Sequence, residues 1–533
     1  MNKTYFLVWI FLLSSLICSA AIVIQGDITT DTTFYMSNNP HQIRGTVRVL
    51  DGAMLTIEPG VNLHFENGSS LEIQGQISAV GTTDMPIWFH SIDSEEYYTK
   101  VYLNGAEGSS FTHCAFSRSN DGTALLRIVN SGTINILHCD FSTSIYAHGI
   151  SIFNSTVNLN YVNVNSIAQS AIQIEGNSPV NINDVNINGC NKGIRVVPSS
   201  YPALAMDDVV LQNCASYPIE ASIINYSVMG YVNAYDCPNR VLAIWDTNLY
   251  NSYTLPNTNI PYYLKNNLSW GNGAVFTLEP GVSLHFGQHG KIFFGGGASL
   301  VANGTEALPI SFLAVGDNHW KGLSFEANTS GSFAHCVFND NGYPEYGYPE
   351  PAISGNGFTC LSFSDCTIRG GTTYGLHLSG SNPGNLTLNN VEIENCPWTG
   401  LYISNNSLIL DYDNLSISNC GRPLEMPANL VDFLDQQPIF SNNTSDRVFL
   451  INNGYMYRDT TFRNWGYPYV CENLDLYANW INLSFQPGVV IQLGYSNAIN
   501  CEGTLSAVGT ESQPITFTRL PESPNNWRGF ILN

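Results

Sequence analysis

The sequence predicts an all-β protein built as a parallel solenoid, in which short strands stack coil upon coil. Apolar and polar residues alternate with period two, as in Val157-Asn158-Leu159 and Leu386-Thr387-Leu388, while helical periodicity is almost absent. Pairs such as Gly149-Ile150 and Ala171-Ile172, which mark one phase of the pattern, recur every 22 to 25 residues. Strands this short cannot bury an apolar face alone, so each must stack on the next copy.

A longer unit contains this short repeat. Three heptapeptides with an internal Pro-Gly recur at Leu55–Val61, Phe276–Val282 and Leu483–Val489, and another proline lies nineteen residues before each Pro-Gly proline. Such spacing indicates homologous units. We place the units at residues 31–251, 252–458 and 459–533, the third being truncated. We expect the natural protein to continue beyond Asn533, with an anchor or an activity there.

The composition limits the partners and the compartment. The chain has 19 Lys and Arg against 42 Asp and Glu, a net charge of −23, which argues against nucleic acid as a partner. Residues 1–20 have the pattern of an export signal, with Lys3 before an apolar run and small residues at the end. No later run is long and apolar enough for a membrane helix. We therefore expect a secreted or cell-surface protein.

These repeats resemble a known family. The short repeat is similar to the coils of right-handed parallel β-helix proteins of the pectate-lyase-like superfamily. The long unit, with its Thr-x-Glu-Pro-Gly-Val and Pro-Ile-x-Phe elements, is similar to segments of secreted bacterial surface proteins. The resemblance implies a right-handed parallel β-helix over nearly the whole mature chain. It leaves the activity open, because the superfamily includes lyases, glycoside hydrolases, adhesins and periplasmic binding proteins.

The Glu-Pro-Gly element has two interpretations. One carboxylate per unit, Glu58 or Glu279, could coordinate a cation, but Gln486 stands at the same place in the third unit. The charge is therefore dispensable to the unit. A type II turn explains the element better, since Pro presets φ at the second turn position and Gly accepts a positive φ at the third.

His-Cys pairs recur on the predicted coils, at His113-Cys114, His138-Cys139 and His335-Cys336. Two such pairs on adjacent coils suggest a zinc site. However, neighbouring residues of a strand point to opposite faces, which favours buried thiols beside an outer ladder of imidazoles. We expect most of the twelve cysteines beyond the signal to be free, because stacked side chains have parallel Cβ vectors and would need distortion to pair.

Paired acids offer a candidate metal site. Asp207 and Asp208 lie 24 residues after Asn183 and Asp184, which places the pairs at the same turn of successive coils. Asn and Asp tolerate the left-handed conformation of such turns. Stacked Asp184 and Asp208 would repel each other unless a cation lay between them. We expect at most a weak Ca²⁺ site at Asp184, Asp207 and Asp208, and no other cofactor.

An enzyme is the alternative interpretation of the family resemblance. The β-helix hydrolases of polysaccharides carry Asn-Thr-Asp, Asp-Asp, Gly-His-Gly and Arg-x-Lys on successive coils. Here Asn-Thr-Asp and Arg-x-Lys are missing, and Gln288 precedes His289 where that pattern has Gly. A lyase would need an Arg or Lys base beside carboxylates, and the scattered basic residues form no such group. The alternative remains a lyase or hydrolase acting on acidic polysaccharide.

An insertion in the second unit suggests binding. The interval from Cys336 to Ala352 is longer than its equivalent in the first unit, and it contains Tyr343, Tyr346 and Tyr348 between prolines. Exposed rigid rings suit stacking on sugars or on a protein partner, although the rings could also fold back onto the coils. We interpret the chain as an exported, non-catalytic scaffold, adhesin-like or glycan-binding, whose partner is a polysaccharide or a cell-surface protein.

Overall fold

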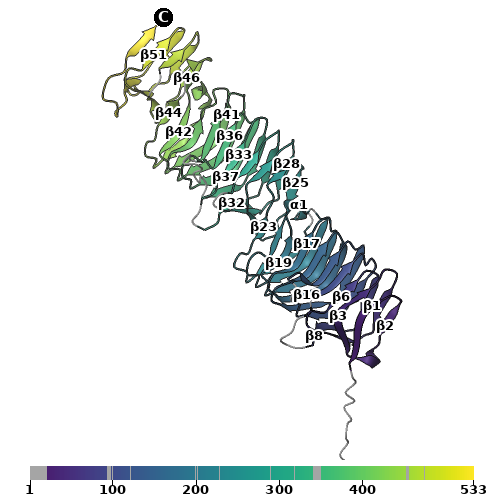
Figure 1. The fold of residues 1–533 in the computed structure, drawn as a ribbon. Helices are drawn as coiled ribbons and strands as arrows, with labels where there is room; N and C mark the ends of the chain where they lie inside the picture. The colour runs from purple at the N-terminus through teal and green to yellow at the C-terminus, as the bar shows by residue number, and fades with distance from the viewer. Residues whose placement is uncertain are drawn as a thin grey trace, which may run out of the picture. The chain divides into compact units, whose positions relative to one another are not determined.

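The computed structural model describes residues 21–92, 98, 100–119, 122–198, 200, 202–226, 229–287, 290–316, 319–339, 350–451, 455–472 and 475–532. These residues form about 19 turns of a parallel solenoid with 3% helix (Figure 1). The predicted fold class, a right-handed parallel β-helix, is confirmed. The helical pieces are η1 (Met36–Asn38), α1 (Ile223–Tyr226) and η2 (Ala428–Phe433). Within the described residues, no helix combines the length and the apolar character needed to cross a membrane.

The largest sheet among the described residues has 35 strands. Its first strands are β1 (Ile22–Ile28), β2 (Thr32–Phe34), β3 (His41–Val49), β4 (Met54–Ile57), β5 (Asn62–Phe65), β6 (Ser70–Ile73), β7 (Gln76–Val80), β8 (Ile87–Ser91), β9 (Lys100–Asn104), β10 (Ser110–Thr112), β11 (Cys114–Ser117), β12 (Ala124–Val129), β13 (Thr133–Leu137), β14 (Asp140–Ser144), β15 (His148–Phe153), β16 (Thr156–Ile167), β17 (Ser170–Glu175) and β18 (Val180–Asn188). The others are β19 (Lys192–Val196), β20 (Leu204–Gln212), β21 (Ile219–Ala221), β22 (Val232–Tyr235), β23 (Leu242–Ile244), β25 (Tyr253–Leu255), β26 (Tyr262–Leu264), β28 (Val275–Leu278), β29 (Ser283–Phe286), β31 (Ser299–Asn303), β32 (Ile310–Ala314), β34 (Ser330–Ala334), β35 (Cys336–Asn339), β37 (Cys360–Arg369), β39 (Asn385–Glu394), β41 (Ile409–Ser418) and β43 (Ile439–Ser441).

A second sheet of 12 described strands carries the surface that matters below. In spatial order it consists of β24 (Asn248–Leu249), β27 (Leu268–Trp270), β30 (Ile292–Phe294), β33 (Leu323–Phe325), β36 (Ile353–Asn356), β38 (Leu376–Ser379), β40 (Thr399–Ile403), β42 (Arg422–Pro427), β44 (Val448–Ile451), β47 (Tyr469–Cys471), β50 (Val490–Leu493) and β53 (Thr516–Arg519). Two small sheets consist of β45 (Tyr455–Met456), β48 (Leu476–Ala478), β51 (Ala498–Cys501) and β54 (Gly529–Leu532), and of β46 (Thr460–Phe462), β49 (Asn482–Phe485) and β52 (Thr504–Ala507).

The core is a set of apolar columns. In β16 and β18, for example, Val162 faces Val185 across the parallel pairing, and both are fully buried. Aromatic columns add stacking, since the rings of Phe89, Phe116 and Phe141 on three successive coils lie 4.5 and 4.7 Å apart. Each such aromatic pair contributes about 0.5–1.5 kcal/mol beyond the burial of its area. The period-two alternation of the sequence therefore becomes a continuous column along the coils.

The bends between strands repeat as strictly as the core. Residues with positive φ recur at one bend on successive coils, among them Asp365 (53°), Asn390 (53°) and Asn414 (51°). Their side chains form a ladder in which the Asn414 amide donates to Asn390 and the Asn390 amide donates to Asp365, both at 2.7 Å. Asn and Asp tolerate this backbone conformation and can bond from coil to coil, which explains why the chain is so rich in Asn.

The type II turn interpretation of the Glu-Pro-Gly element is confirmed. Gly60, Gly281 and Gly488 have φ of 83°, 89° and 84°. The residue before Pro-Gly uses its side-chain oxygen to accept a backbone N–H from the preceding coil, which joins Glu58 to Met36 at 2.9 Å, Glu279 to Asn257 at 3.1 Å and Gln486 to Asn464 at 3.1 Å. An amide oxygen accepts this bond as a carboxylate does, so Gln can replace Glu.

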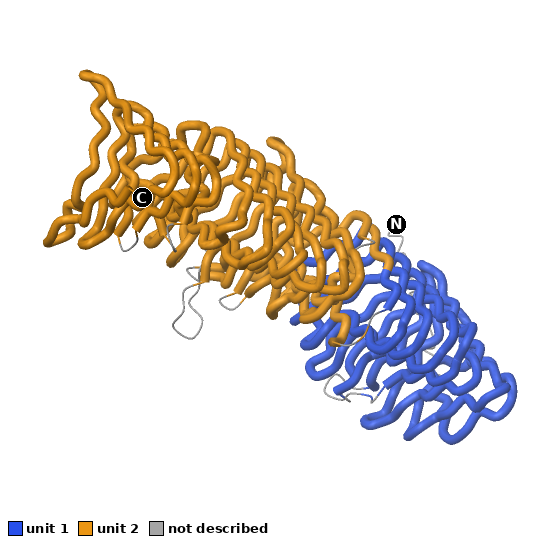
Figure 2. The backbone as a smooth tube through the Cα atoms, turned by 90° about the horizontal axis from the view of Figure 1, so that it is seen from above, with its two compact units in different colours: residues 1–193, 202–204, 208–213 blue, residues 194–201, 205–207, 214–533 orange. Residues whose placement is uncertain are grey.

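The described chain divides into two compact units (Figure 2). One comprises residues 1–193, 202–204 and 208–213, and the other comprises residues 194–201, 205–207 and 214–533. This division follows contacts between coils and falls inside the first long unit of the sequence repeat. The repeat boundaries at 251/252 and 458/459 stay a prediction from the sequence.

The His-Cys pairs form two separate ladders, as predicted. The rings of His113 and His138 stack at 4.7 Å, and His138 stacks on Tyr161 at 4.7 Å. Cys114 and Cys139 are fully buried in the core. All twelve described cysteines are free. Burial raises the pKa of the Cys190 thiol to about 11, so that thiol stays protonated and unreactive near neutral pH.

We expect a thiol titration of the unreduced, denatured chain from residue 21 onward to find all twelve cysteines free. In the native protein only Cys237 and Cys360, which are partly exposed, should react rapidly. Two or fewer thiols in the denatured chain would show that the stacked coils tolerate disulfide geometry after all.

Candidate functional site

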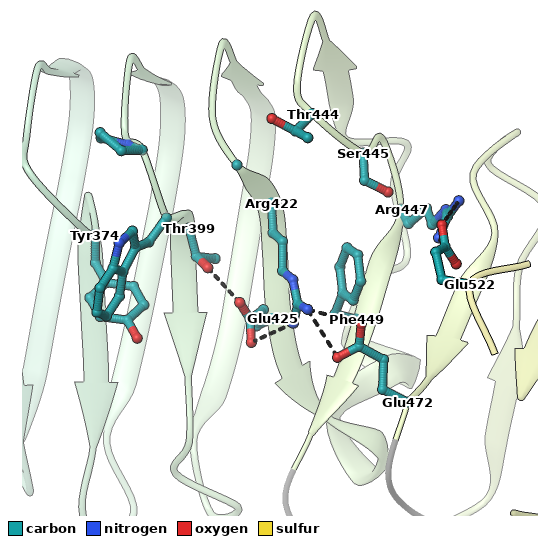
Figure 3. Close-up of a pocket in the computed structure, with 13 residues that line it drawn as sticks. Tyr374, Thr399, Arg422, Glu425, Thr444, Ser445, Arg447, Phe449, Glu472 and Glu522 are labelled. Atoms are coloured by element: carbon teal, nitrogen blue, oxygen red, sulfur yellow. Dashed lines mark hydrogen bonds and ion pairs between the residues drawn. The ribbon is translucent and has the colours of Figure 1, made fainter. Parts of the chain in front are cut away.

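A cleft of about 580 Å³ lies in the second compact unit, over the 12-stranded sheet (Figure 3). Its lining comes from successive coils, from Tyr374 just before β38 to Glu522 just after β53. It contains two arginines, three glutamates, three aromatic rings and three hydroxyl side chains. A volume of this size is typical of small-molecule sites.

The strand register places the column of side chains from which the cleft is built. His377, Tyr402, Glu425, Phe449 and Val470 are register partners on β38, β40, β42, β44 and β47, so they lie in one column on the outer face of the sheet. Of these, Glu425 and Phe449 line the cleft, and Leu520 packs with the buried Phe449 and Val470. The chain neighbours that precede His377, Tyr402 and Glu425 in sequence are fully buried leucines. Because side chains alternate along a strand, burying those leucines forces the polar and aromatic residues outward.

One end of the cleft is aromatic. The Tyr374 ring lies edge-on to Trp398 at 5.4 Å, and it also contacts His377 at 5.0 Å and Tyr402 at 5.1 Å. Trp398 remains 49% exposed. The neighbours hold the aromatic cluster in place while the indole stays open to solvent, so the cluster forms a rigid apolar platform.

The centre of the cleft is an ion-pair network around Arg422. Its Nη2 donates to both carboxylate oxygens of Glu472 at 2.9 Å, and Nη1 lies 3.5 Å from Glu425. The guanidinium also lies 4.1 Å from the centre of the Phe449 ring. Glu425 in turn accepts a hydrogen bond from the Thr399 hydroxyl (Figure 3). Arg422 is therefore held on three sides.

The other end of the cleft carries a second ion pair. Arg447 donates to both oxygens of Glu522, at 3.0 and 3.2 Å. This pair lowers the pKa of Glu522 below its ordinary value, because the hydrogen bonds from Arg447 stabilise the carboxylate. Next to it, Phe449 packs with Val470 and Leu520 in a small buried cluster that fixes the ring beneath Arg422.

Burial and charge set the protonation of the platform. The pKa values of Tyr374 and Tyr402 are raised, mainly by burial and further by the negative charge of Glu425. Their phenols therefore stay protonated at neutral pH and can donate hydrogen bonds. Burial lowers the pKa of His377 below 6.5, which favours the neutral imidazole.

The binding residues predicted from the sequence, Tyr343, Tyr346 and Tyr348, lie outside the described residues. Their role in binding stays a prediction. The described residue after that insertion, Glu350, forms an ion pair with Lys291 at 3.2 Å, and its carbonyl accepts a bond from Thr373.

The predicted metal ligands occupy the turns expected for them. Asp184 and Asp208, both in the first compact unit, have φ of 51° and 49°. The Asp184 carboxylate accepts a bond from Asn183 at 2.8 Å. Asp207 belongs to the second unit and accepts the Tyr231 backbone N–H at 2.8 Å. In the described part of the chain, no group of three or more His, Cys, Asp or Glu is placed to hold a metal ion. The Ca²⁺ site stays a prediction.

The sequence interpretation missed the cleft residues, although a signal exists for two residues that contact Tyr374 at its aromatic end. Tyr402 follows Gly400-Leu401, a pair that marks the short repeat, and His377 follows Gly375-Leu376 in the same way. The residue after each marker pair is therefore outward on a known face. Arg422 and Glu472 carry no comparable signal, since their contact joins residues 50 positions apart.

Comparisons with known proteins do not assign this chain to a family. No family model matches the chain. The chain is 44% identical to the protein bark beetle of Drosophila melanogaster over 57 residues. This matched segment makes up 11% of this chain and 2% of that protein. The periplasmic alginate epimerase AlgG shows 10% identity, covering 71% of this chain and 77% of that one, with a TM-score of 0.15. A tailspike protein of E. coli bacteriophage HK620, solved with a pentasaccharide, shows 11% identity, covering 89% of this chain and 71% of that one, with a TM-score of 0.15.

The half-buried imidazole of His377 should make stability depend on pH. The folded state binds its proton less readily than the unfolded state, so protonation favours unfolding. Its contribution is fully present above pH 6.5 and is lost as the pH falls below that value toward the lower folded pKa. The denaturation midpoint should therefore fall less between about pH 8 and about pH 5 in His377→Gln than in the wild type. An equal fall of the denaturation midpoint in both proteins would contradict the lowered pKa of His377. An NMR titration that gives His377 a pKa of 6.5 or above would contradict it as well.

Proposed function

We propose that this protein is an exported, non-catalytic β-helix scaffold that binds glycans through the cleft over the 12-stranded sheet. The observation that carries the proposal is Trp398, a half-exposed indole held against Tyr374 at the end of a polar cleft. A sugar ring has an apolar face and a rim of hydroxyl groups. An exposed aromatic ring beside fixed carboxylates and hydroxyls is complementary to both features.

The extent of the cleft supports a chain ligand. Its lining residues come from the coils of β38 to β47, which are separated by four strand spacings in the sheet order, and from Glu522, whose carboxylate reaches back to Arg447 beside β44. At about 4.8 Å per spacing the cleft extends roughly 19 Å along the coils. An oligosaccharide lying along the stacked coils would contact the same kind of outward position on each coil.

The non-catalytic part of the proposal rests on how the carboxylates are used. A glycosidase needs one protonated carboxyl group and one free carboxylate on either side of the bond that it cleaves. Here Glu425 and Glu472 both contact the guanidinium of Arg422. The competing enzyme, a lyase or hydrolase of acidic polysaccharide, would release unsaturated or reducing sugars from uronate polymers. We expect no such release with or without Ca²⁺, and its detection would overturn this part.

Export, and a place outside the cell or on its surface, rest on the pattern of residues 1–20, which lie outside the described residues. A cell-surface protein is the alternative partner. For that partner the insertion with Tyr343, Tyr346 and Tyr348 is the favoured contact, and Ca²⁺ at Asp184, Asp207 and Asp208 would be a separate, weak site.

Replacing the exposed indole tests the cleft. Trp398→Ala should weaken binding to the best ligand on a glycan array by about tenfold or more, because stacked rings dominate such interfaces. The matched control is Trp480→Ala, which removes an 81% exposed indole that does not line the cleft. Equal affinities for the two variants would remove the cleft from the binding function.

The insertion is tested separately. Replacing Tyr343, Tyr346 and Tyr348 together with Ala should leave the melting temperature unchanged, because the inserted segment interrupts the repeat and is expected from the sequence to add little to the stacked core. If the rings stack on ligand, affinity for a glycan or a captured surface protein should fall by about 1 to 3 kcal/mol. Unchanged affinity for every ligand would remove these tyrosines from the binding site.

A further inference from the structure

The cleft has a charge pattern that discriminates between classes of glycan. Its two arginines face three glutamates, which leaves one negative charge in excess, and the whole chain carries −23. From this pattern and the contacts of each charged group, we infer that the cleft takes an uncharged glycan rather than a uronate or an amino-sugar polymer. This inference rests on the proposed function.

The arginines are not available to a carboxylate ligand. Proteins recognise a carboxylate best with the two parallel N–H donors of an arginine. Arg422 already directs Nη2 at both carboxylate oxygens of Glu472, has Nη1 beside Glu425 and covers the Phe449 ring. A uronate would have to displace one of these groups, and it would approach a cleft of like charge.

The second arginine is also engaged by a carboxylate. Arg447 makes the two-donor contact, from Nη1 and Nη2 to the two oxygens of Glu522. A ligand carboxylate would have to break this pair as well.

The glutamates are equally committed, which disfavours a cationic sugar. Glu472 and Glu522 each hold both carboxylate oxygens on an arginine, and Glu425 accepts from Thr399 as well as lying beside Arg422. An ammonium group would compete with guanidinium groups already in place. A carboxylate oxygen has more than one lone pair, however, so each can still accept a hydroxyl from a neutral sugar.

The remaining surface of the cleft suits such a sugar. Trp398 offers an apolar face, and the exposed Thr444 hydroxyl lies on the rim (Figure 3). None of these groups selects for charge. The ion pairs then position the carboxylates and cancel most of their field, while stacking and hydrogen bonds select the ligand.

The test compares four hexasaccharides by titration calorimetry on the full chain: β-1,4-linked glucose, β-1,4-linked N-acetylglucosamine, α-1,4-linked galacturonate and β-1,4-linked glucosamine. At least one of the two neutral chains should bind, and neither charged chain should. The affinity of the neutral chain should change less than about twofold between about 50 mM and about 500 mM NaCl, because no ligand charge is screened.

A charge variant supplies a gain of function. Glu472→Gln removes the carboxylate partner of Arg422 and makes the lining one unit more positive, so the galacturonate chain should acquire salt-sensitive binding. Trp398→Ala in the same background should remove the binding of the neutral chain. Thr444→Ala, which removes only a rim hydroxyl, is the control and should keep the neutral preference.

The outcomes separate the two proposals. Binding of galacturonate or glucosamine to the wild type, without a neutral chain, would overturn this inference and leave glycan binding standing. Failure of all four chains to bind would overturn the proposed function and this inference together. Neutral binding without any gain for galacturonate in Glu472→Gln would show that the ion pairs do not set the selectivity, and it would overturn the inference as argued.

Discussion

The stacking of each coil on the next is the constraint on which the rest of this structure depends. No coil has a complete core of its own, since its inward residues are covered only when the coils on either side supply the same column, as Phe89, Phe116 and Phe141 do for one another. The strands of successive coils are parallel and hydrogen-bonded to each other in a fixed register. A residue at one position of a coil therefore meets its equivalent on the next, at one strand spacing of about 4.8 Å.

The same repetition governs the polar parts of the chain. Bends with positive φ recur at the same position of successive coils. There the side chains of Asp365, Asn390 and Asn414 form a ladder, in which each Asn amide donates a hydrogen bond to the residue on the preceding coil. Within each long unit, the Glu-Pro-Gly turn is joined to the preceding coil by one accepted N–H, which is why Gln486 can stand where Glu58 and Glu279 stand elsewhere. These repeated bonds satisfy polar groups in a chain of which only 11% of the residues are charged.

Stacking also creates the cleft, because the outward face of a solenoid is a set of columns just as the core is. Where the outward column changes from Tyr402 to Glu425 to Phe449, it places an aromatic platform, an acidic group and a buried ring at successive strand spacings. Arg422 then links coils by contacting both Glu425 and Glu472. The ion pairs hold their partners in one arrangement, and Trp398 supplies an apolar face that remains open.

The sequence by itself determined the fold, the length of the coils, the buried thiols and the turns, because each follows from a local period or from the backbone preference of single residues such as Gly60 and Asp184. It also indicated which residues face outward, since these follow the markers of the short repeat. Only the tertiary structure decided which outward residues meet. Arg422 and Glu472 are 50 residues apart, and their contact depends on the exact number of residues in each intervening coil. The charge balance of the cleft depends on which charged residues from different coils lie side by side, so it cannot be read from any single segment of the sequence.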